Sequence, residues 1–243
     1  EDMREIAKLG VSYLGGCCGT TPKHIERMIE LCKDIADSVP AKKNDTVVCS
    51  YSTSVTIGDK PVVIGERINP TGKKLFKEAL RNNNIDYIIK EGIAQQEKGA
   101  HILDVNVGLP EIDEVAMLQS AVYNLQSVLP LPLQLDSSDT TALEKAMRMY
   151  NGKAMINSVN GKQSSMSEVF PLVQKYGGVV VCLCLDESGI PETAEGRIAI
   201  AKKIIKTAES YGIDKKDLVV DALVMTISTN KDNAKETLKA VEY

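Results

Sequence analysis

Two cysteines stand side by side near the start of the sequence, in the segment Gly15-Gly16-Cys17-Cys18-Gly19-Thr20. Zinc favours thiolate ligands, but neighbouring side chains on a regular strand point to opposite faces. The surrounding glycines allow an irregular turn that would aim both thiols at one ion. The segment therefore predicts part of a zinc site at Cys17 and Cys18, with an incidental or buried cysteine pair as the alternative.

Carboxylates and amides recur further along the chain, at or just past the carboxyl ends of apolar runs. Any one of them fits a turn or a helix cap, but the repetition over four runs indicates one shared site. Carboxylates accept paired N–H groups and amides both donate and accept, so we expect a neutral heterocycle such as a pterin. A phosphate would call for Gly-rich backbone or basic residues instead. The residues are Asp104, Asn106, Asp136, Asn157 and Asp221.

A strand–helix rhythm from residue 62 onward would position these residues. The expected strands are continuous apolar runs, typical of parallel strands covered on both faces. Polar groups at successive strand ends converge at the mouth of a (β/α)8 TIM barrel, whereas a doubly wound sheet gathers them at one switch point. We therefore expect an α/β barrel with about six of eight βα units present. The strands are predicted at 62–66, 101–107, 131–136, 153–159, 178–185 and 217–223, and the helices near 73–81, 85–99, 111–128, 139–149, 165–176, 193–211 and 230–242.

The composition changes before this rhythm begins, which predicts three parts. Residues 1–38 hold an expected strand at 11–16 and an expected helix at 21–38, and read as the last piece of another domain. Residues 39–61 are rich in turn formers and β-branched residues, and predict a linker and possible hairpin. Residues 62–243 form the barrel, which is expected to be cut short at its C-terminal end.

Charge and composition exclude several classes of protein. The net charge of −4 and the lack of a basic cluster argue against nucleic acid as a partner. No apolar run approaches the roughly 20 residues that span a bilayer, and the charged start of the chain is unlike a signal peptide. Six cysteines in 243 residues are too few for a disulfide scaffold, so a cytoplasmic location is expected.

Several reactive side chains are predicted to be structural rather than functional. Cys32 falls on the apolar face of an expected helix, and Cys182 and Cys184 alternate on an expected strand, so all three are predicted core thiols. His24 and His101 have no ligand partner at a useful spacing and are also taken as structural.

Several segments of the sequence resemble segments of a known protein family. It is similar to the pterin-binding barrel of cobalamin-dependent methionine synthases, a family that includes methyltetrahydrofolate:corrinoid methyltransferases and, more distantly, dihydropteroate synthases. Its start resembles the end of the homocysteine-binding barrel that precedes it in methionine synthases. The segments that carry the resemblance are VVIGERINPTGKKLFKEAL (62–80), GAHILDVNVG (99–108), LPLQLDSSD (131–139), AMINSVNG (154–161), VVDALVMTIS (219–228) and GVSYLGGCCGTTPKHI (10–25).

The resemblance implies roles for the residues at the mouth. Asp136 would bind the amino-pyrimidine edge of the pterin, and Asn157 and Asp221 would be further ligands of the ring. A further Asn of the family, placed near pterin N5, would lie beyond residue 243. The remaining residues would lie beside the ring, its water network and the first-strand corner: Asp104, Asn106, Glu66 and Asn69.

The resemblance also implies an activity. The chain would bind 5-methyltetrahydrofolate and pass its N5 methyl group to cob(I)alamin carried by another domain or protein, as part of methionine synthesis from homocysteine. A stand-alone corrinoid-protein methyltransferase is the nearest alternative, and the cysteine segment argues against it. A dihydropteroate synthase and a non-catalytic fragment remain open.

For zinc, the resemblance implies three cysteine ligands, of which Cys17 and Cys18 are two. The third would come from an earlier strand that this chain lacks, and Cys32 and Cys49 are too far along the chain to replace it. We therefore expect little tight, stoichiometric zinc binding by this chain alone, measured as metal content after dialysis. One firmly held zinc ion per chain, lost in a Cys17→Ser/Cys18→Ser variant, would contradict this expectation.

Overall fold

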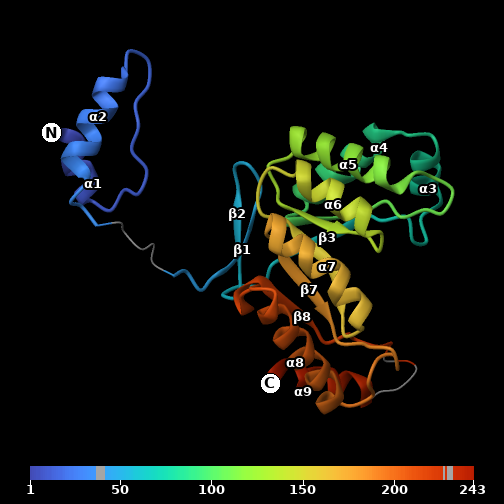
Figure 1. Cartoon of the computed structure of the whole chain (residues 1–243). Coiled ribbons are helices and arrows are strands. Elements are labelled where there is room, and N and C mark those ends of the chain that lie inside the picture. Colours follow the sequence, from blue (N-terminus) through green and yellow to red (C-terminus); the bar gives the residue numbers. More distant parts are fainter. Residues whose placement is uncertain (37–41, 227, 229–231) are drawn as a thin grey trace. The chain divides into compact units, whose positions relative to one another are not determined.

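The computed structural model describes residues 1–36, 42–226, 228 and 232–243. The chain forms two compact units, Glu1–Asn44 and Asp45–Tyr243 (Figure 1). The boundary between them lies within the stretch that composition assigned to a linker and hairpin.

The first unit is a pair of packed helices, α1 (Asp2–Lys8) and α2 (Pro22–Cys32). The strand predicted at 11–16 is absent, and that prediction is wrong. Residues 11–16 have no regular secondary structure and are mostly exposed, whereas a strand is held by a ladder of hydrogen bonds to a neighbouring strand. The helix predicted over 21–38 ends at Cys32, and its last two residues lie outside the described part of the chain.

Helix α2 begins as the sequence indicates. Thr21 has extended backbone angles and Pro22 takes the first helical position, where its missing N–H costs nothing. The Thr21 backbone N–H donates to His24 Nδ1 at 3.1 Å, so His24 has the structural role predicted for it. Cys32 is only half-buried, with its Sγ 3.9 Å from the Met3 carbonyl oxygen, so it is not the core thiol that was expected.

The second unit contains all six predicted strands in one parallel sheet, ordered β3-β4-β5-β6-β7-β8. Each strand pairs with the next along the chain, as in a TIM barrel, and β3 and β8 form the two edges. The sheet is therefore a TIM-barrel-like arrangement of six βα units. The strands are β3 (Ile64–Ile68), β4 (Ile102–Asn106), β5 (Leu133–Asp136), β6 (Met155–Asn160), β7 (Val179–Leu183) and β8 (Leu218–Asp221).

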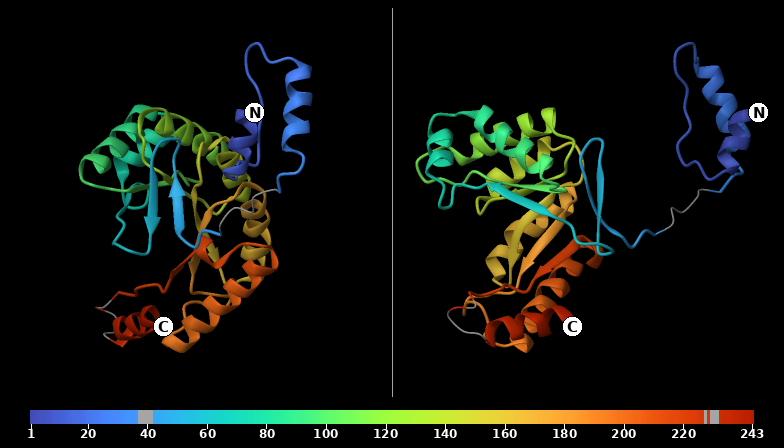
Figure 2. Two further views of the ribbon diagram at one scale, coloured as in Figure 1. Left: turned by 90° about the vertical axis from the view of Figure 1, so that its left-hand side faces the viewer. Right: turned by 180° about the vertical axis from the view of Figure 1, so that it is seen from behind.

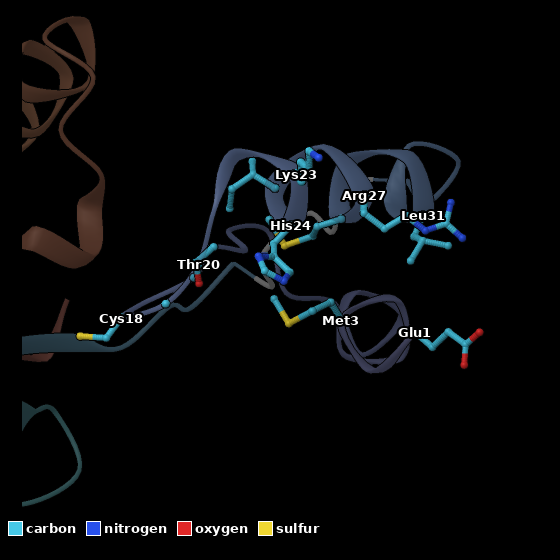
Figure 3. Close-up of a pocket in the computed structure, with 13 residues that line it drawn as sticks. Glu1, Met3, Cys18, Thr20, Lys23, His24, Arg27 and Leu31 are labelled. Carbon is cyan, nitrogen blue, oxygen red and sulfur yellow. The ribbon is translucent and has the colours of Figure 1, made fainter.

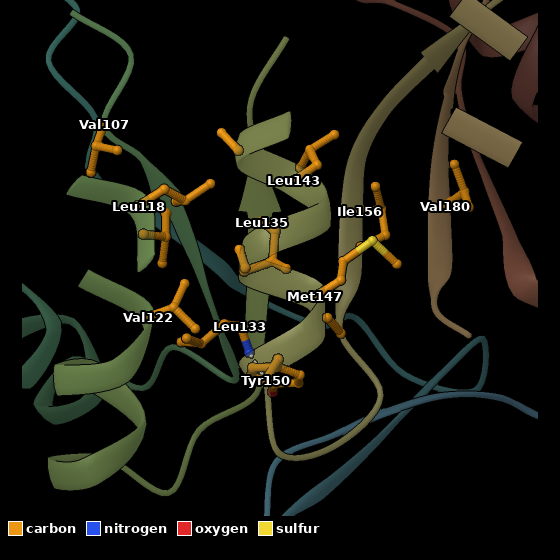
Figure 4. Close-up of a cluster of buried hydrophobic side chains, with 14 of the residues drawn as sticks. Val107, Leu118, Val122, Leu133, Leu135, Leu143, Met147, Tyr150, Ile156 and Val180 are labelled. Atoms are coloured by element: carbon orange, nitrogen blue, oxygen red, sulfur yellow. Dashed lines mark hydrogen bonds between the residues drawn. The ribbon is translucent and has the colours of Figure 1, made fainter. Parts of the chain in front are cut away.

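Helices cover one face of this sheet, with α5 and α6 packed over the central strands (Figure 4). Several begin at a side chain that accepts a backbone N–H of the first turn, as Asp113 does for α5 and Asp139 for α6. Leu103, Leu133 and Leu135 point into this helix-covered layer and are fully buried. The helices are α3 (Lys74–Arg81), α4 (Ile85–Glu97), α5 (Glu114–Val128), α6 (Thr140–Met149), α7 (Gln163–Tyr176), α8 (Ala194–Ser210), the short η1 (Lys215–Asp217) and α9 (Asp232–Glu242).

The inner face of the sheet is covered at its amino-terminal end by a hairpin (Figure 2). Strands β1 (Thr46–Cys49) and β2 (Ser54–Ile57) pair antiparallel. Val48 of the hairpin is fully buried in a second apolar cluster with Ile102 and Met155 of the sheet. Because the hairpin fills this end, polar side chains on the inner face have room only at the carboxyl end.

Hydrogen bonds tie the hairpin to the segments that lead into the strands. Tyr150 Oη donates to the Cys49 carbonyl oxygen and accepts from the Leu133 backbone N–H, both at 3.0 Å. Ser50 Oγ donates to the Pro130 carbonyl oxygen at 2.5 Å. The Tyr150 hydroxyl thus connects the hairpin, helix α6 and strand β5.

Two further structural predictions, for a cysteine pair and for His101, are confirmed. Cys182 and Cys184 are buried free thiols, and burial raises the pKa of Cys182 to about 12 and of Cys184 to about 11. His101 Nδ1 accepts the Val63 backbone N–H at 2.9 Å, which is a structural role.

Replacing Tyr150 with Phe should destabilise the second unit. The change removes the hydroxyl that the buried Leu133 N–H donates to, at a cost of about 1–3 kcal/mol. The Cys49 carbonyl loses one hydrogen bond but still accepts the Lys153 backbone N–H at 3.0 Å. Urea unfolding should show a lower midpoint for Tyr150→Phe than for wild type. Tyr123→Phe, at a side chain 59% exposed, is the control. Equal midpoints for both variants would contradict the tethering role.

Candidate functional site

Three polar residues stand in one row on the inner face of the sheet, near the carboxyl ends of three neighbouring strands. Asn106 on β4 is in register with Asp136 on β5, and Asp136 with Asn157 on β6. Asn106 Nδ2 donates to Asp136 Oδ2 at 2.9 Å, and Asn106 Oδ1 accepts the Gly108 backbone N–H at 2.9 Å. This polar row is half-buried, so its remaining donors and acceptors can meet a ligand.

A buried pair lies one layer below the polar row. Asp104 is two residues before Asn106 on the same face of β4, and is only 2% exposed. It is in register with Gln134 on β5, whose Nε2 donates to Asp104 Oδ1. Asn157 also hydrogen-bonds to Asp104, so the two layers are connected.

The first-strand corner lies beside these layers. Glu66 is exposed on β3, where the pairing with β4 shifts register. Asn69 is buried, and its Nδ2 lies 3.4 Å from Glu66 Oε1 while its Oδ1 accepts the Thr71 N–H at 2.9 Å. Glu66 acts electrostatically on Asp104 and Asp136, which places the corner at the same mouth.

Asp221 takes a different position from the other predicted site residues. It ends β8 in register with Leu183 of β7, so a whole strand separates it from Asn157. Its Oδ1 accepts the backbone N–H of Leu223 at 2.7 Å, and the fully buried Arg197 donates to the Leu223 carbonyl at 3.2 Å. Register, hydrogen bonds or electrostatic interactions thus link six of the seven predicted residues, whereas Asp221 contacts Leu223 and strand β7. The six define the mouth: Glu66, Asn69, Asp104, Asn106, Asp136 and Asn157.

Sequence reasoning missed three residues at the mouth. Gln134 precedes Asp136 by two positions and so shares its face, which is a signal that strand alternation alone provides. Ser137 Oγ donates to Glu114 Oε1, and accepts the Asp139 N–H at 3.0 Å. Glu114 lies in the first turn of α5, and only the packing of α5 against the strand ends brings it to Asp136.

The mouth gathers carboxyl groups with little opposing charge, which raises their pKa values. Burial is the main cause of the raised pKa of Asp104, about 7, and the nearby Asp136 carboxylate adds to it. The hydrogen bonds from Gln134 and Asn157 act in the opposite direction. The pKa of Asp136 is also raised, first by burial and then by Glu66 and Glu114, against the hydrogen bond from Asn106.

This arrangement can bind a neutral ring through paired hydrogen bonds and can hold protons beside it at neutral pH. It does not favour an anion, because carboxylates and amides line it. Within the described ranges, no helix is long and apolar enough to cross a membrane.

The two adjacent cysteines lie in the first unit, and both are exposed. Cys18 lines a hollow with Thr20, His24 and Met3, but its side chain points away from His24 (Figure 3). In the described part of the chain, no three His, Cys, Asp or Glu side chains gather as metal ligands. These residues alone do not fit a complete zinc site, so no zinc chemistry follows from their geometry.

Replacing Asp104 with Asn should change how stability depends on pH. A pKa of about 7, against 3.8 for an ordinary Asp, means that the folded chain binds this proton more tightly than the unfolded chain. Stability is therefore lost as pH rises from about 4 to 7, by at most about 4 kcal/mol. The Asn variant lacks this loss. Its free energy of unfolding, measured in urea, should therefore rise relative to that of wild type between pH 5 and pH 8. The raised pKa of Asp104 would be contradicted if the difference in free energy of unfolding between Asp104→Asn and wild type stayed constant with pH. It would also be contradicted if the exposed control Asp59→Asn showed the same pH-dependent difference.

Both parts of the chain match known protein families. Residues 65–243 match the family described as pterin binding enzyme, and residues 1–32 match the family described as homocysteine S-methyltransferase. The methionine synthase of Mycobacterium leprae (strain TN) is 33% identical over 255 residues, covering 97% of this chain and 21% of that protein. The methionine synthase of Mycobacterium tuberculosis (strain ATCC 25618 / H37Rv) is 32% identical, with the same coverage. The chain spans about a fifth of the length of these relatives.

Solved structures share the fold at lower identity. The dihydropteroate synthase from Xanthomonas albilineans in complex with 7,8-dihydropteroate has a TM-score of 0.62 and 19% identity, covering 81% of this chain and 74% of that one. The 7,8-dihydropteroate synthase from Vibrio fischeri ES114 has a TM-score of 0.56 and 17% identity, covering 74% and 67%. The sheet, the family match over residues 65–243 and the relatives along nearly the whole chain together show that this chain belongs to the family of pterin-binding enzymes.

Proposed function

We propose that the mouth binds 5-methyltetrahydrofolate and that the chain takes part in transferring its N5 methyl group to cob(I)alamin during methionine synthesis. The observation that carries this proposal is the in-register polar row of Asn106, Asp136 and Asn157. The similarity to methionine synthases supports the reaction, and the family match supports a pterin as the ligand.

The polar row suits the edge of a pterin. In the proposed complex the Asp136 carboxylate accepts two N–H groups of the amino-pyrimidine, and its partner Asn106 holds it in place. Asn157 contacts the ring carbonyl or a ring N–H, since an amide offers both a donor and an acceptor. Glu66 and Asn69 border the same ring from the first-strand corner, and Asp221 extends the set from β8.

The methyl transfer makes a second demand, because a tertiary amine is a poor leaving group. The N5 nitrogen needs a proton, or a hydrogen bond that strengthens in the transition state. A buried carboxyl group with a pKa of about 7 can hold a proton at neutral pH, and Asp104 has this property. The acceptor cobalamin would be carried by another domain or protein, and the open mouth would admit it.

The start of the chain supports the methionine synthase assignment over a stand-alone corrinoid-protein methyltransferase. Residues 1–32 match the homocysteine S-methyltransferase family, which a stand-alone enzyme would not contain. We therefore propose that residues 1–38 are the end of a homocysteine-binding domain, in which Cys17 and Cys18 supply two of the zinc ligands. Residues 39–61 would then be the linker and hairpin, and residues 62–243 the pterin-binding domain. All six cysteines are free thiols, which supports a reducing, cytoplasmic location.

Replacing Asp136 with Asn should weaken methyltetrahydrofolate binding, because Asn presents one acceptor oxygen and no charge to the amino-pyrimidine edge. The loss should be roughly 10- to 100-fold in Kd, as for hydrogen bonds to a charged group. The measurement is calorimetric titration of this chain and of a version extended by two further βα units.

Asp59→Asn, which changes an exposed carboxylate in the same way, should bind as wild type does. Two results would contradict the assignment of the mouth as a pterin-binding site. One is no folate affinity in the extended wild-type chain, and the other is unchanged affinity in Asp136→Asn.

A further inference from the structure

We propose that Gln134 is a positioning residue for Asp104, holding its carboxyl group at the floor of the mouth so that this group can both keep and release a proton. This inference deepens the proposed function and rests on it for its consequence in methyl transfer. The ionisation of Asp104 itself can be measured without any folate.

The contact between the two side chains is direct and buried. Gln134 is 5% exposed and Asp104 is 2% exposed, and Gln134 Nε2 donates to Asp104 Oδ1. The two residues are register partners on neighbouring strands, so the sheet itself sets their separation. Gln134 pairs on its other side with Met155, which belongs to the inner apolar cluster.

Packing alone does not explain a glutamine at this position. Its carbonyl oxygen Oε1 is buried and has no hydrogen-bond partner among the described residues. A buried acceptor without a partner costs stability, and an apolar side chain of the same size would avoid that cost. What Gln134 provides, and Met or Leu cannot, is the N–H directed at Asp104.

The charged surroundings of Asp104 show what this N–H does. Carboxylates face it from two neighbouring strands, Glu66 on β3 and Asp136 on β5, and both disfavour its ionised form. Burial acts in the same direction, and more strongly. The opposing contributions are the hydrogen bonds from Gln134 and from Asn157 on β6. Without the hydrogen bond from Gln134, Asp104 would hold its proton more tightly.

The test follows the Asp104 carboxyl carbon by NMR in chain labelled with ¹³C-carboxyl aspartate, with Asp104→Asn to assign the signal. In Gln134→Met the midpoint of the Asp104 titration should rise by about one pH unit, a roughly tenfold tighter hold on the proton. The control Gln126→Met removes a glutamine amide on α5 that bonds to Asn151 and Met149, and should leave the midpoint unchanged. An unchanged or lower midpoint in Gln134→Met overturns the inference.

A measurement on the wild-type chain keeps the inference testable if Gln134→Met does not fold. The side-chain amide resonances of Gln134 should shift with pH at the same midpoint as the Asp104 carboxyl carbon, and should stop doing so in Asp104→Asn. If the side-chain amide resonances of Gln134 do not shift as Asp104 titrates, the inference is overturned.

Folate binding measured as a function of pH distinguishes a failure of this inference from a failure of the proposed function. If the mouth binds methyltetrahydrofolate, the pH profile of its Kd should move upward in Gln134→Met together with the Asp104 midpoint. Absence of folate binding at every pH would refute the proposed function alone, because the two NMR titrations do not involve folate.

Discussion

A parallel strand covered on both faces leaves few places for a polar side chain, and the site of this protein depends on that constraint. Helices bury the outward residues of the sheet, and the β1–β2 hairpin buries the inward residues at the amino-terminal end. Among the described residues, polar side chains from several strands meet at the carboxyl end of the inner face. Strand register then turns separate Asp and Asn residues into one row, because Asn106, Asp136 and Asn157 stand at matching positions.

The same constraint gives the mouth its electrostatic character. Asp104 and Asp136 are withdrawn from water and lie near one another, with amides rather than cations as hydrogen-bond partners. Their raised pKa values follow from this arrangement and reduce stability at neutral and higher pH. Such a cost is common at functional sites, where groups are held in states that the fold alone would not favour. It is consistent with a site that must handle a proton beside a neutral ring.

The two units differ in how far the chain by itself explains their structure. The second unit has two apolar clusters, one between the sheet and its helices and one between the sheet and the hairpin. The first unit has apolar side chains that stay exposed, such as Leu9, Tyr13 and Ile29. Its helix α2 begins where the local signals at Thr21 and Pro22 predict, and it packs against α1. The apolar run at 11–16 forms no strand, because a strand depends on a neighbour for its hydrogen bonds.

The sequence alone determined the order and type of the elements from residue 62 onward, since hydrophobic runs, helix caps and turn residues act over short distances. Polar residues at the ends of apolar strands also pointed to Asp104, Asn106, Asp136, Asn157 and Asp221, and the family resemblance added Glu66 and Asn69. Tertiary structure decided which of them meet. Register pairs Gln134 with Asp104, packing of α5 brings Glu114 to Asp136, and register sets Asp221 beside Leu183 of β7. The pKa values likewise depend on burial and on charges from other strands, and these exist only once the sheet has formed.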